Sequence, residues 1–564
     1  MRFLIAYVWK PGTHLIKCVN AKNRSKMKNG LLAQNEDLSV TSDSHHQFSI
    51  KPVIFLFVIG AAIRLFASYF TFVINSDGVL YINQAKMIYY GQWDLLTSSG
   101  YSYLSNYPFF IACAYAIVGN WLVAAKSISF LFGFFTLVPL YLLFNRFFNR
   151  NISLLGCLIY ALMPVFVDRS ADIVRDPVYW FFMVTGIYFF ILQNQERYRL
   201  YIFLSSISYL LATWARIEAI LFIVLSSIYL LISGKMRVER FLVFLSPVII
   251  VTVVFILHVR LFDIDVGIIN RTPEIVNKFT EPINRYMELR KELTSLHLII
   301  PSDNDLMICF LPKVRHCVWL IGFGTLFHYF VEGFFPPFCL VLIIGFFGSR
   351  EKFKKSSWLQ YFCLLIFGGW LLLYAHLMHT WLMDQRFLAI VMFPCFIFVG
   401  FGLEKVNLYL QSRFRLKELS AFTVIFLIIL SIGFAKNVQY RNVDKLVFRQ
   451  IGELVAEREK NNDGYVEVLS SSDKMRQFAF YSNSNNERQI LPQLINMNEM
   501  TGNSYYEFLE HLKQKKIKYF LWEEKYWMRQ SFDIMTQEYA KHFKKLGSWY
   551  HSDTGKMILF EVKL

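Results

Sequence analysis

The chain has 564 residues, of which 55% are hydrophobic, 18% aromatic and only 18% charged, and its mean hydropathy is +0.38. Because a soluble domain carries about 25% charged residues, this composition excludes a soluble enzyme, a disordered chain and a disulfide-rich secreted module. The formal net charge of +17 comes from Lys and Arg in short strips between apolar segments, so it predicts membrane topology and no nucleic-acid partner.

The N-terminal segment, residues 1–52, is polar and basic. It contains no apolar stretch of signal-peptide length, and MRFLIAYVW is not followed by a small-residue cleavage site. We expect this segment to be a disordered cytoplasmic tail.

Apolar segments then dominate residues 53–435, which we interpret as a transmembrane domain. They lie near 53–74, 121–144, 152–167, 177–192, 200–214, 218–233, 241–260, 318–347, 357–375, 386–402 and 419–435. Several are shorter than the roughly 20 residues that cross a bilayer, so we expect them to extend into their flanks. The sequence predicts a polytopic α-helical membrane protein of about eleven spans, with a bend at Pro336-Pro337 and a short surface helix at 107–118.

The connections between these segments alternate in charge. The strips near 145–151, 193–199, 234–240, 349–357 and 404–418 carry 15 Lys and Arg, whereas the opposite short loops carry 5. Basic residues are retained in the cytoplasm. The protein is therefore predicted to lie in a cell inner or plasma membrane. Its N-terminus is predicted to face the cytoplasm, and its C-terminal region to lie on the outer side.

Two larger polar pieces are predicted on the outer side. The first, at about 261–316, has helical spacing around 281–293 and holds Cys309 and Cys317, which form either a disulfide or a free pair. The second, residues 436–564, is predicted to be an extracytoplasmic α/β domain. It opens with an amphipathic helix, followed by strands at 465–471, 518–522 and 557–562 and helices near 504–515 and 533–545.

Ionisable residues gather at the predicted outer ends of the spans. Because charged groups are costly in hydrocarbon, such positions are informative about function. A transporter would place them near the bilayer midplane, whereas this arrangement indicates a catalytic cleft at the outer surface. The set is Asp77, Asp172, Asp176, Arg216, Glu218, Asp384 and Arg386.

The first outer loop contains a predicted helix that begins near Asp77. Tyr81 follows at i+4, so it lies on the same helical face and supports the loop. Asp77 is then either a catalytic carboxylate, or Ser76 or Asp77 simply caps the helix.

Each of the other candidates also has two interpretations. Asp172 and Asp176 either line the same cleft, or Asp176 is the N-cap of a helix that starts at Pro177. Arg216 and Arg386 either extend to the membrane surface as anchors, or bind the phosphate of a lipid-linked donor.

No cofactor is assigned from the sequence. His376 and His379 make a weak metal site without a third ligand, so a divalent metal is left open.

At these residues the chain resembles the GT-C superfamily of integral-membrane glycosyltransferases. Within that superfamily it looks like the bacterial relatives of the protein O-mannosyltransferases and of the lipid A aminoarabinose transferase. The resemblance covers about 53–435 and also extends to the C-terminal tail. It rests on Asp77, Tyr81, Ala85, Gly91-Gln92-Trp93, Tyr107-Pro108, Gly119, Asp176, Arg216 and Arg386-Phe387. One departure is that many members carry Asp-Glu where this chain has Asp77-Gly78.

The resemblance implies transfer of a monosaccharide from a polyprenyl-phosphate donor to an acceptor hydroxyl on the outer face of the membrane. The acceptor is a glycan, a lipid or a protein. Asp77 would be the base of an inverting reaction, and Arg216 and Arg386 would hold the leaving phosphate. Alternatives are a flippase or transporter of lipid-linked sugars, a polysaccharide polymerase or ligase, and a non-catalytic scaffold.

Overall fold

The computed structural model describes most of the chain from residue 51 onward. The described residues are 51–98, 104–233, 236–261, 272–299, 305–353, 356–461, 464–471, 475–485, 490, 500, 504–527, 532–535 and 541–563. The cytoplasmic tail expected over 1–52 therefore lies outside them, except for its last two residues.

Each apolar segment expected to cross the membrane contains at least one helix. This agreement follows from composition, because a backbone in hydrocarbon must satisfy its own hydrogen bonds. The helices are α2 (Lys51–Tyr69), α6 (Trp121–Phe135), α7 (Leu137–Phe147), α8 (Arg150–Leu162), α9 (Pro164–Ala171), α10 (Asp176–Ile191), α11 (Tyr198–Ala215), α12 (Ile220–Ile232), α13 (Arg237–Leu261), α15 (Asp305–Gly333), α16 (Pro336–Gly348), α18 (Ser357–Thr380), α19 (Ala389–Phe414) and α20 (Glu418–Asn437).

The chain is a multi-pass membrane protein, with more helices than clear spans. Within the described residues, seven helices are long and apolar enough to cross a membrane, and α8 with α9, bent by 55°, makes up to eight. The count of eleven therefore stays a prediction. The expected bend in 318–347 is present: α15 ends before Pro336, and Phe335 adopts a φ of 64°.

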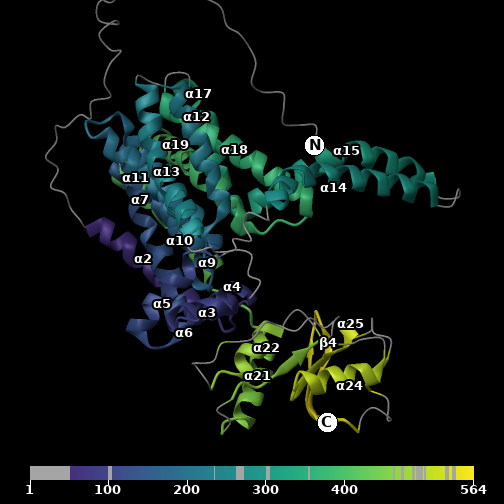
Figure 1. Cartoon of the computed structure of the whole chain (residues 1–564). Coiled ribbons are helices and arrows are strands. Elements are labelled where there is room, and N and C mark those ends of the chain that lie inside the picture. The colour runs from purple at the N-terminus through teal and green to yellow at the C-terminus, as the bar shows by residue number, and fades with distance from the viewer. Residues whose placement is uncertain are drawn as a thin grey trace, which may run out of the picture. The chain divides into compact units, whose positions relative to one another are not determined.

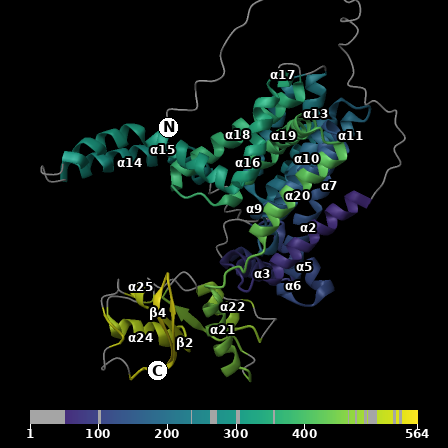
Figure 2. The same cartoon turned by 180° about the vertical axis from the view of Figure 1, so that it is seen from behind.

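The first outer loop folds into α3 (Ser76–Tyr89), α4 (Trp93–Ser98) and α5 (Tyr107–Val118). Figures 1 and 2 both show α3, α5 and α6 together at one end of the helical bundle. Most side chains of α3 are buried, from Gly78 to Met87. The helix is therefore enclosed by its neighbours and is not a helix lying freely on a membrane surface.

A short backbone contact joins the end of α2 to the segment after α20. Thr71 and Arg441 form an isolated parallel bridge, and the Arg441 amide donates to the Phe70 carbonyl at 3.1 Å. The Arg441 guanidinium also pairs with Asp168 at 2.7 Å. Two segments that are 370 residues apart in sequence, from Thr71 to Arg441, are thus joined beside the first outer loop.

The predicted helix around 281–293 is part of α14 (Thr272–Ile299), which packs against α15. Cys309 and Cys317 lie on α15, and both are free and exposed. The disulfide alternative is therefore wrong.

The C-terminal region contains a four-stranded sheet with the order β1-β2-β4-β3. Its strands are β1 (Val468–Ser470), β2 (Tyr519–Glu523), β3 (Phe543–His551) and β4 (Gly555–Val562); β1 is parallel to β2 and the other pairs are antiparallel. The helices are α21 (Leu446–Arg458), α22 (Met475–Ser482), α24 (Tyr505–Gln514) and α25 (Glu524–Trp527).

The helix expected near 533–545 is wrong at its C-terminal end, because Phe543 opens strand β3. Residues 534–535 lie in a turn, and residues 536–540 of the expected helix lie outside the described residues. Residues from Phe543 onward form a strand because they pair with β4 in a hairpin. Gly555, at a φ of 76°, follows the turn, and cross-strand pairing overrides local helical spacing.

Candidate active site

Asp77 sits in the first turn of α3 and does not cap that helix. The cap is Asn75, whose backbone is extended and whose side-chain Oδ1 accepts from the Gly78 amide at 2.5 Å. The capping alternative for Ser76 or Asp77 is therefore wrong. The Asp77 carboxylate, 38% exposed, is directed to another partner, and a carboxylate near a helix N-terminus is stabilised by the helix dipole.

Gly78 explains the departure from the Asp-Glu pattern. A Cβ at this position would lie 2.9 Å from the Cβ of Ile173, which belongs to the second outer loop. A glutamate therefore does not fit while that loop packs this closely. The only side chain small enough here is hydrogen.

Arg386 is the partner of Asp77. It lies on the short 3-10 helix η3 (Gln385–Leu388), and its Nη1 donates to Asp77 Oδ2 at 2.9 Å across 309 residues of sequence. Its Nε is 3.2 Å from Asp384, whose Oδ1 also accepts from the Arg386 amide. Arg386 is 25% exposed, and its guanidinium contacts both of these carboxylates.

Arg169 extends this network to the second outer loop. Its Nη2 donates to Asp384 at 2.9 Å, and its Nη1 is 3.7 Å from Asp172. Burial raises the pKa of the Asp172 carboxyl, an effect that Arg169 opposes. The sequence interpretation overlooked Arg169, although its i,i+3 spacing to Asp172 was a usable signal.

Arg216 and Asp176 form a second, deeper ion pair. The Arg216 Nη1 donates to Asp176 at 2.5 Å, and Nη2 pairs with Glu218 at 2.9 Å. Arg216 is 4% exposed and Asp176 is 1% exposed. Asp176 therefore neutralises a buried arginine and is not an N-cap: α10 is preceded by Arg175 and has no side-chain cap.

Phe387 connects the two ion-pair groups. The Arg216 guanidinium lies 4.6 Å from the centre of its ring, and that of Arg386 lies 5.5 Å from it. Beside this ring is a cavity of about 90 Å³ with both charged and apolar walls. It is lined by Tyr179, Arg216, Glu218, Leu372, Leu373, His376, Arg386, Phe387 and Ile390.

Tyr81 has a supporting position. It is 8% exposed and packs edge-on against Tyr107 of α5, with ring centres 5.2 Å apart. Burial raises the pKa of Tyr81 to about 12, so the phenol stays protonated at neutral pH. Its contribution is to fix α3, and thereby Asp77, against α5.

The two histidines do not share a metal site. His376 packs against Phe387, whereas the Nε2 of His379 lies 3.5 Å from Glu281 of α14. Among the described residues, no group of three or more His, Cys, Asp or Glu side chains is placed to hold a metal ion.

Comparisons with known proteins add the following. The family described as dolichyl-phosphate-mannose-protein mannosyltransferase matches residues 106–259, which include Asp172, Asp176 and Arg216. No curated protein sequence matches significantly.

Among solved structures, ArnT from Cupriavidus metallidurans in the apo state is similar with a TM-score of 0.55 at 11% identity, over 91% of this chain and 98% of that one. The same protein bound to undecaprenyl phosphate gives 0.52 at 9% identity, over 91% and 98%. The oligosaccharyltransferase AglB from Archaeoglobus fulgidus gives 0.49 at 12% identity, over 90% of this chain and 74% of that one.

Proposed function

Since the chain has the GT-C fold of integral-membrane glycosyltransferases, we propose that it transfers a monosaccharide from a polyprenyl-phosphate donor to an acceptor hydroxyl on the outer face of the membrane. The observation that carries this proposal is the meeting of Asp77 with Arg386 at 2.9 Å, next to the cavity that Arg216 also lines. A carboxylate and two guanidinium groups thus lie close together, as a base and two phosphate ligands would have to.

The donor class is supported by two features. ArnT, which shares the fold, is known bound to undecaprenyl phosphate, and the matching family is described by a dolichyl-phosphate sugar. In this chain the cavity beside Phe387 is lined by the guanidinium groups of Arg216 and Arg386 and by the apolar side chains Leu372, Leu373 and Ile390. Such walls suit a phosphate attached to a hydrocarbon chain.

Asp77 is the proposed base. It accepts the proton of the acceptor hydroxyl while the acceptor oxygen attacks the anomeric carbon, and the bond from that carbon to the phosphate oxygen breaks with inversion. The phosphodiester donor becomes a phosphomonoester, so the leaving group gains one negative charge. Arg386 and Arg216 offset that charge as it develops.

The ion pair between Asp77 and Arg386 implies that the donor binds before Asp77 acts as a base. Arg386 contacts the Asp77 carboxylate at 2.9 Å and so occupies an oxygen that an acceptor hydroxyl would need. When a donor phosphate binds Arg386, the planar fork turns from the carboxylate toward the phosphate. Asp77 is then released to act as a base only after donor is bound.

The experiment is a transfer assay with the full-length protein in lipid nanodiscs. Undecaprenyl-phosphate monosaccharides are supplied with envelope glycan fractions, and new glycosidic bonds are measured by mass spectrometry. Comparing the glycans of cells with and without the protein identifies the sugar added. Movement of the lipid-linked sugar across a bilayer without a new bond would instead indicate a flippase. Addition of whole oligosaccharide blocks would indicate a polymerase or ligase.

A further inference from the structure

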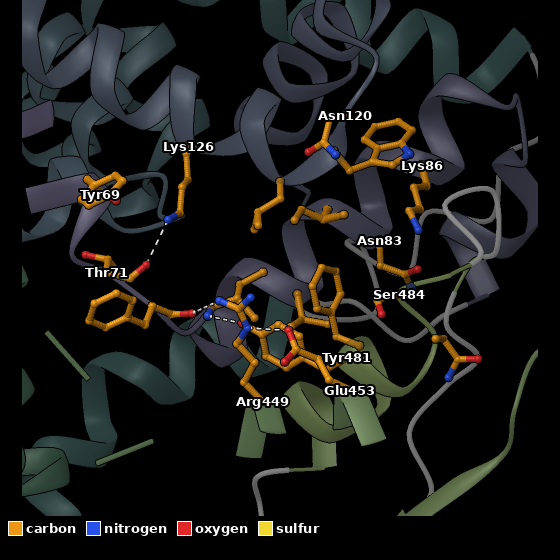
Figure 3. A pocket seen from close by; sticks show the side chains of 18 residues that line it. Tyr69, Thr71, Asn83, Lys86, Asn120, Lys126, Arg449, Glu453, Tyr481 and Ser484 are labelled. Atoms are coloured by element: carbon orange, nitrogen blue, oxygen red, sulfur yellow. Dashed lines mark hydrogen bonds and ion pairs between the residues drawn. The ribbon is translucent and has the colours of Figure 1, made fainter. Parts of the chain in front are cut away.

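A second cavity, of about 370 Å³, lies beside α3 (Figure 3). Its walls come from α3, from residues 69–74, from the start of α6 and from α21 and α22 of the C-terminal region. In Figure 3, Lys126 and Lys86 reach it from one side and Arg449 and Tyr481 from the other. Its volume is in the range of small-molecule sites.

This cavity uses the face of α3 that is turned away from Asp77. At about 100° per residue, Val79, Ile82, Asn83 and Lys86 lie roughly opposite to Asp77 on the helix. These four residues line the cavity, and Asp77 does not. The cavity is therefore separate from the one beside Phe387, although one helix contributes to both regions.

The net charge of the lining is positive. Its described residues include three cationic side chains, Lys86, Lys126 and Arg449, and one carboxylate, Glu453, which pairs with the Arg449 guanidinium at 2.7 Å. Lys126 is held by the carbonyl oxygens of Ser68 at 3.2 Å and Thr71 at 3.1 Å, which orient the ammonium without neutralising it. Such a lining favours an anionic ligand.

The remaining lining groups suit a sugar. Trp121 adds an aromatic side chain, which is 3% exposed. Asn83 adds an amide group, and Phe72 adds an apolar ring.

We propose that this cavity, the Lys86–Lys126–Arg449 pocket, binds an anionic sugar residue of the acceptor, carrying a carboxylate or a phosphate. That the ligand is part of the acceptor rests on the proposed function. If both proposals hold, the acceptor is an acidic glycan. An α-helix with side chains is about 10 Å across, a distance that a short oligosaccharide spans to reach Asp77 on the other face.

Direct binding tests the pocket without relying on catalysis. The full-length protein in nanodiscs is titrated calorimetrically with methyl glucuronide and glucose 6-phosphate, with methyl glucoside and inorganic phosphate as controls. The test variant is Ser484→Asp, because Ser484 is exposed and a carboxylate there adds a negative charge at the pocket. Ser484→Asn is the matched neutral control, and Lys86→Gln removes a positive charge.

The expected result is binding of both acidic sugars, at least tenfold weakened by Ser484→Asp and by Lys86→Gln and unchanged by Ser484→Asn. Equal binding of methyl glucoside, or binding of inorganic phosphate as tight as that of glucose 6-phosphate, would overturn the assignment to an anionic sugar. Binding that is unaffected by Ser484→Asp would place the ligand elsewhere and would also overturn it.

Kinetics then distinguish this proposal from the proposed function. In the transfer assay, Ser484→Asp is expected to raise KM for an acidic acceptor while leaving KM for the lipid-linked donor unchanged. Asp77→Asn should leave binding of methyl glucuronide intact. If no transfer occurs but the sugar binds, the proposed function fails and the pocket stands. If transfer depends on Asp77 but Ser484→Asp leaves KM for the acidic acceptor unchanged, the pocket proposal fails alone.

Discussion

Replacing Asp77 by Asn separates catalysis from structure at the candidate site. The cap of α3 belongs to Asn75, so the substitution leaves it in place. What is lost in stability is one ion pair between groups that are 38% and 25% exposed, and such pairs contribute about 0–1 kcal/mol. Loss of a general base, in contrast, lowers the rate by about 10²–10⁴. We therefore expect near wild-type abundance, intact donor binding and almost no transfer.

The matched control for this variant is Asp384→Asn. Asp384 contacts the same arginine at 3.2 Å and is 34% exposed, so its loss disturbs Arg386 to a similar degree. Both variants are assayed for sugar transfer per mole of folded protein, with folding checked by thermal unfolding. If Asp77→Asn keeps more than about a tenth of the activity, Asp77 is not the base. Equal losses in both variants would assign the effect to the position of Arg386.

Three further predictions concern neighbouring groups. Arg386→Ala should weaken donor binding about tenfold to a hundredfold, from the 1.5–3 kcal/mol of a charged hydrogen bond, with Arg386→Lys recovering part of it in a donor titration. Arg216→Ala should lower the melting temperature, since a buried Asp176 left without its partner costs about 3–5 kcal/mol; an unchanged melting temperature would contradict the buried pair. Tyr506→Cys, at a side chain 70% exposed, should react with an impermeant thiol reagent in intact cells or spheroplasts, above wild-type background. Labelling only after lysis would reverse the proposed orientation.

The helical framework could be predicted from the sequence because hydrocarbon imposes one solution on long apolar segments. It was also predictable that Asp77 and Arg386 lie at the same depth relative to the membrane, since both stand at the ends of apolar segments. Their direct contact was not, because the pairing depends on how η3 packs against α3. The contact of Arg169 with Asp384 could not be predicted for the same reason, because the two residues are distant in sequence. The spacing of Arg169 to Asp172 was the one local signal.

Local signals misled where a tertiary partner decides the outcome. Asp176 before Pro177 has the spacing of a helix cap, yet its carboxylate pairs with Arg216, which follows the last residue of α11. Residues near 543 have some helical spacing, yet they pair with β4. In both cases a residue pairs with a partner distant in sequence and not with the adjacent residues that the local pattern indicated.

The bridge between Thr71 and Arg441 restricts the topology in a way that charge counting does not. It holds the end of α2 and the exit from α20 at one level, through the 3.1 Å hydrogen bond from Arg441 to Phe70. A chain that leaves a bilayer and returns to the same side has crossed it an even number of times. Any revision of the helices between these residues must therefore add or remove crossings in pairs. Whatever the final number, the loop that carries Asp77 and the C-terminal sheet belong to the same compartment.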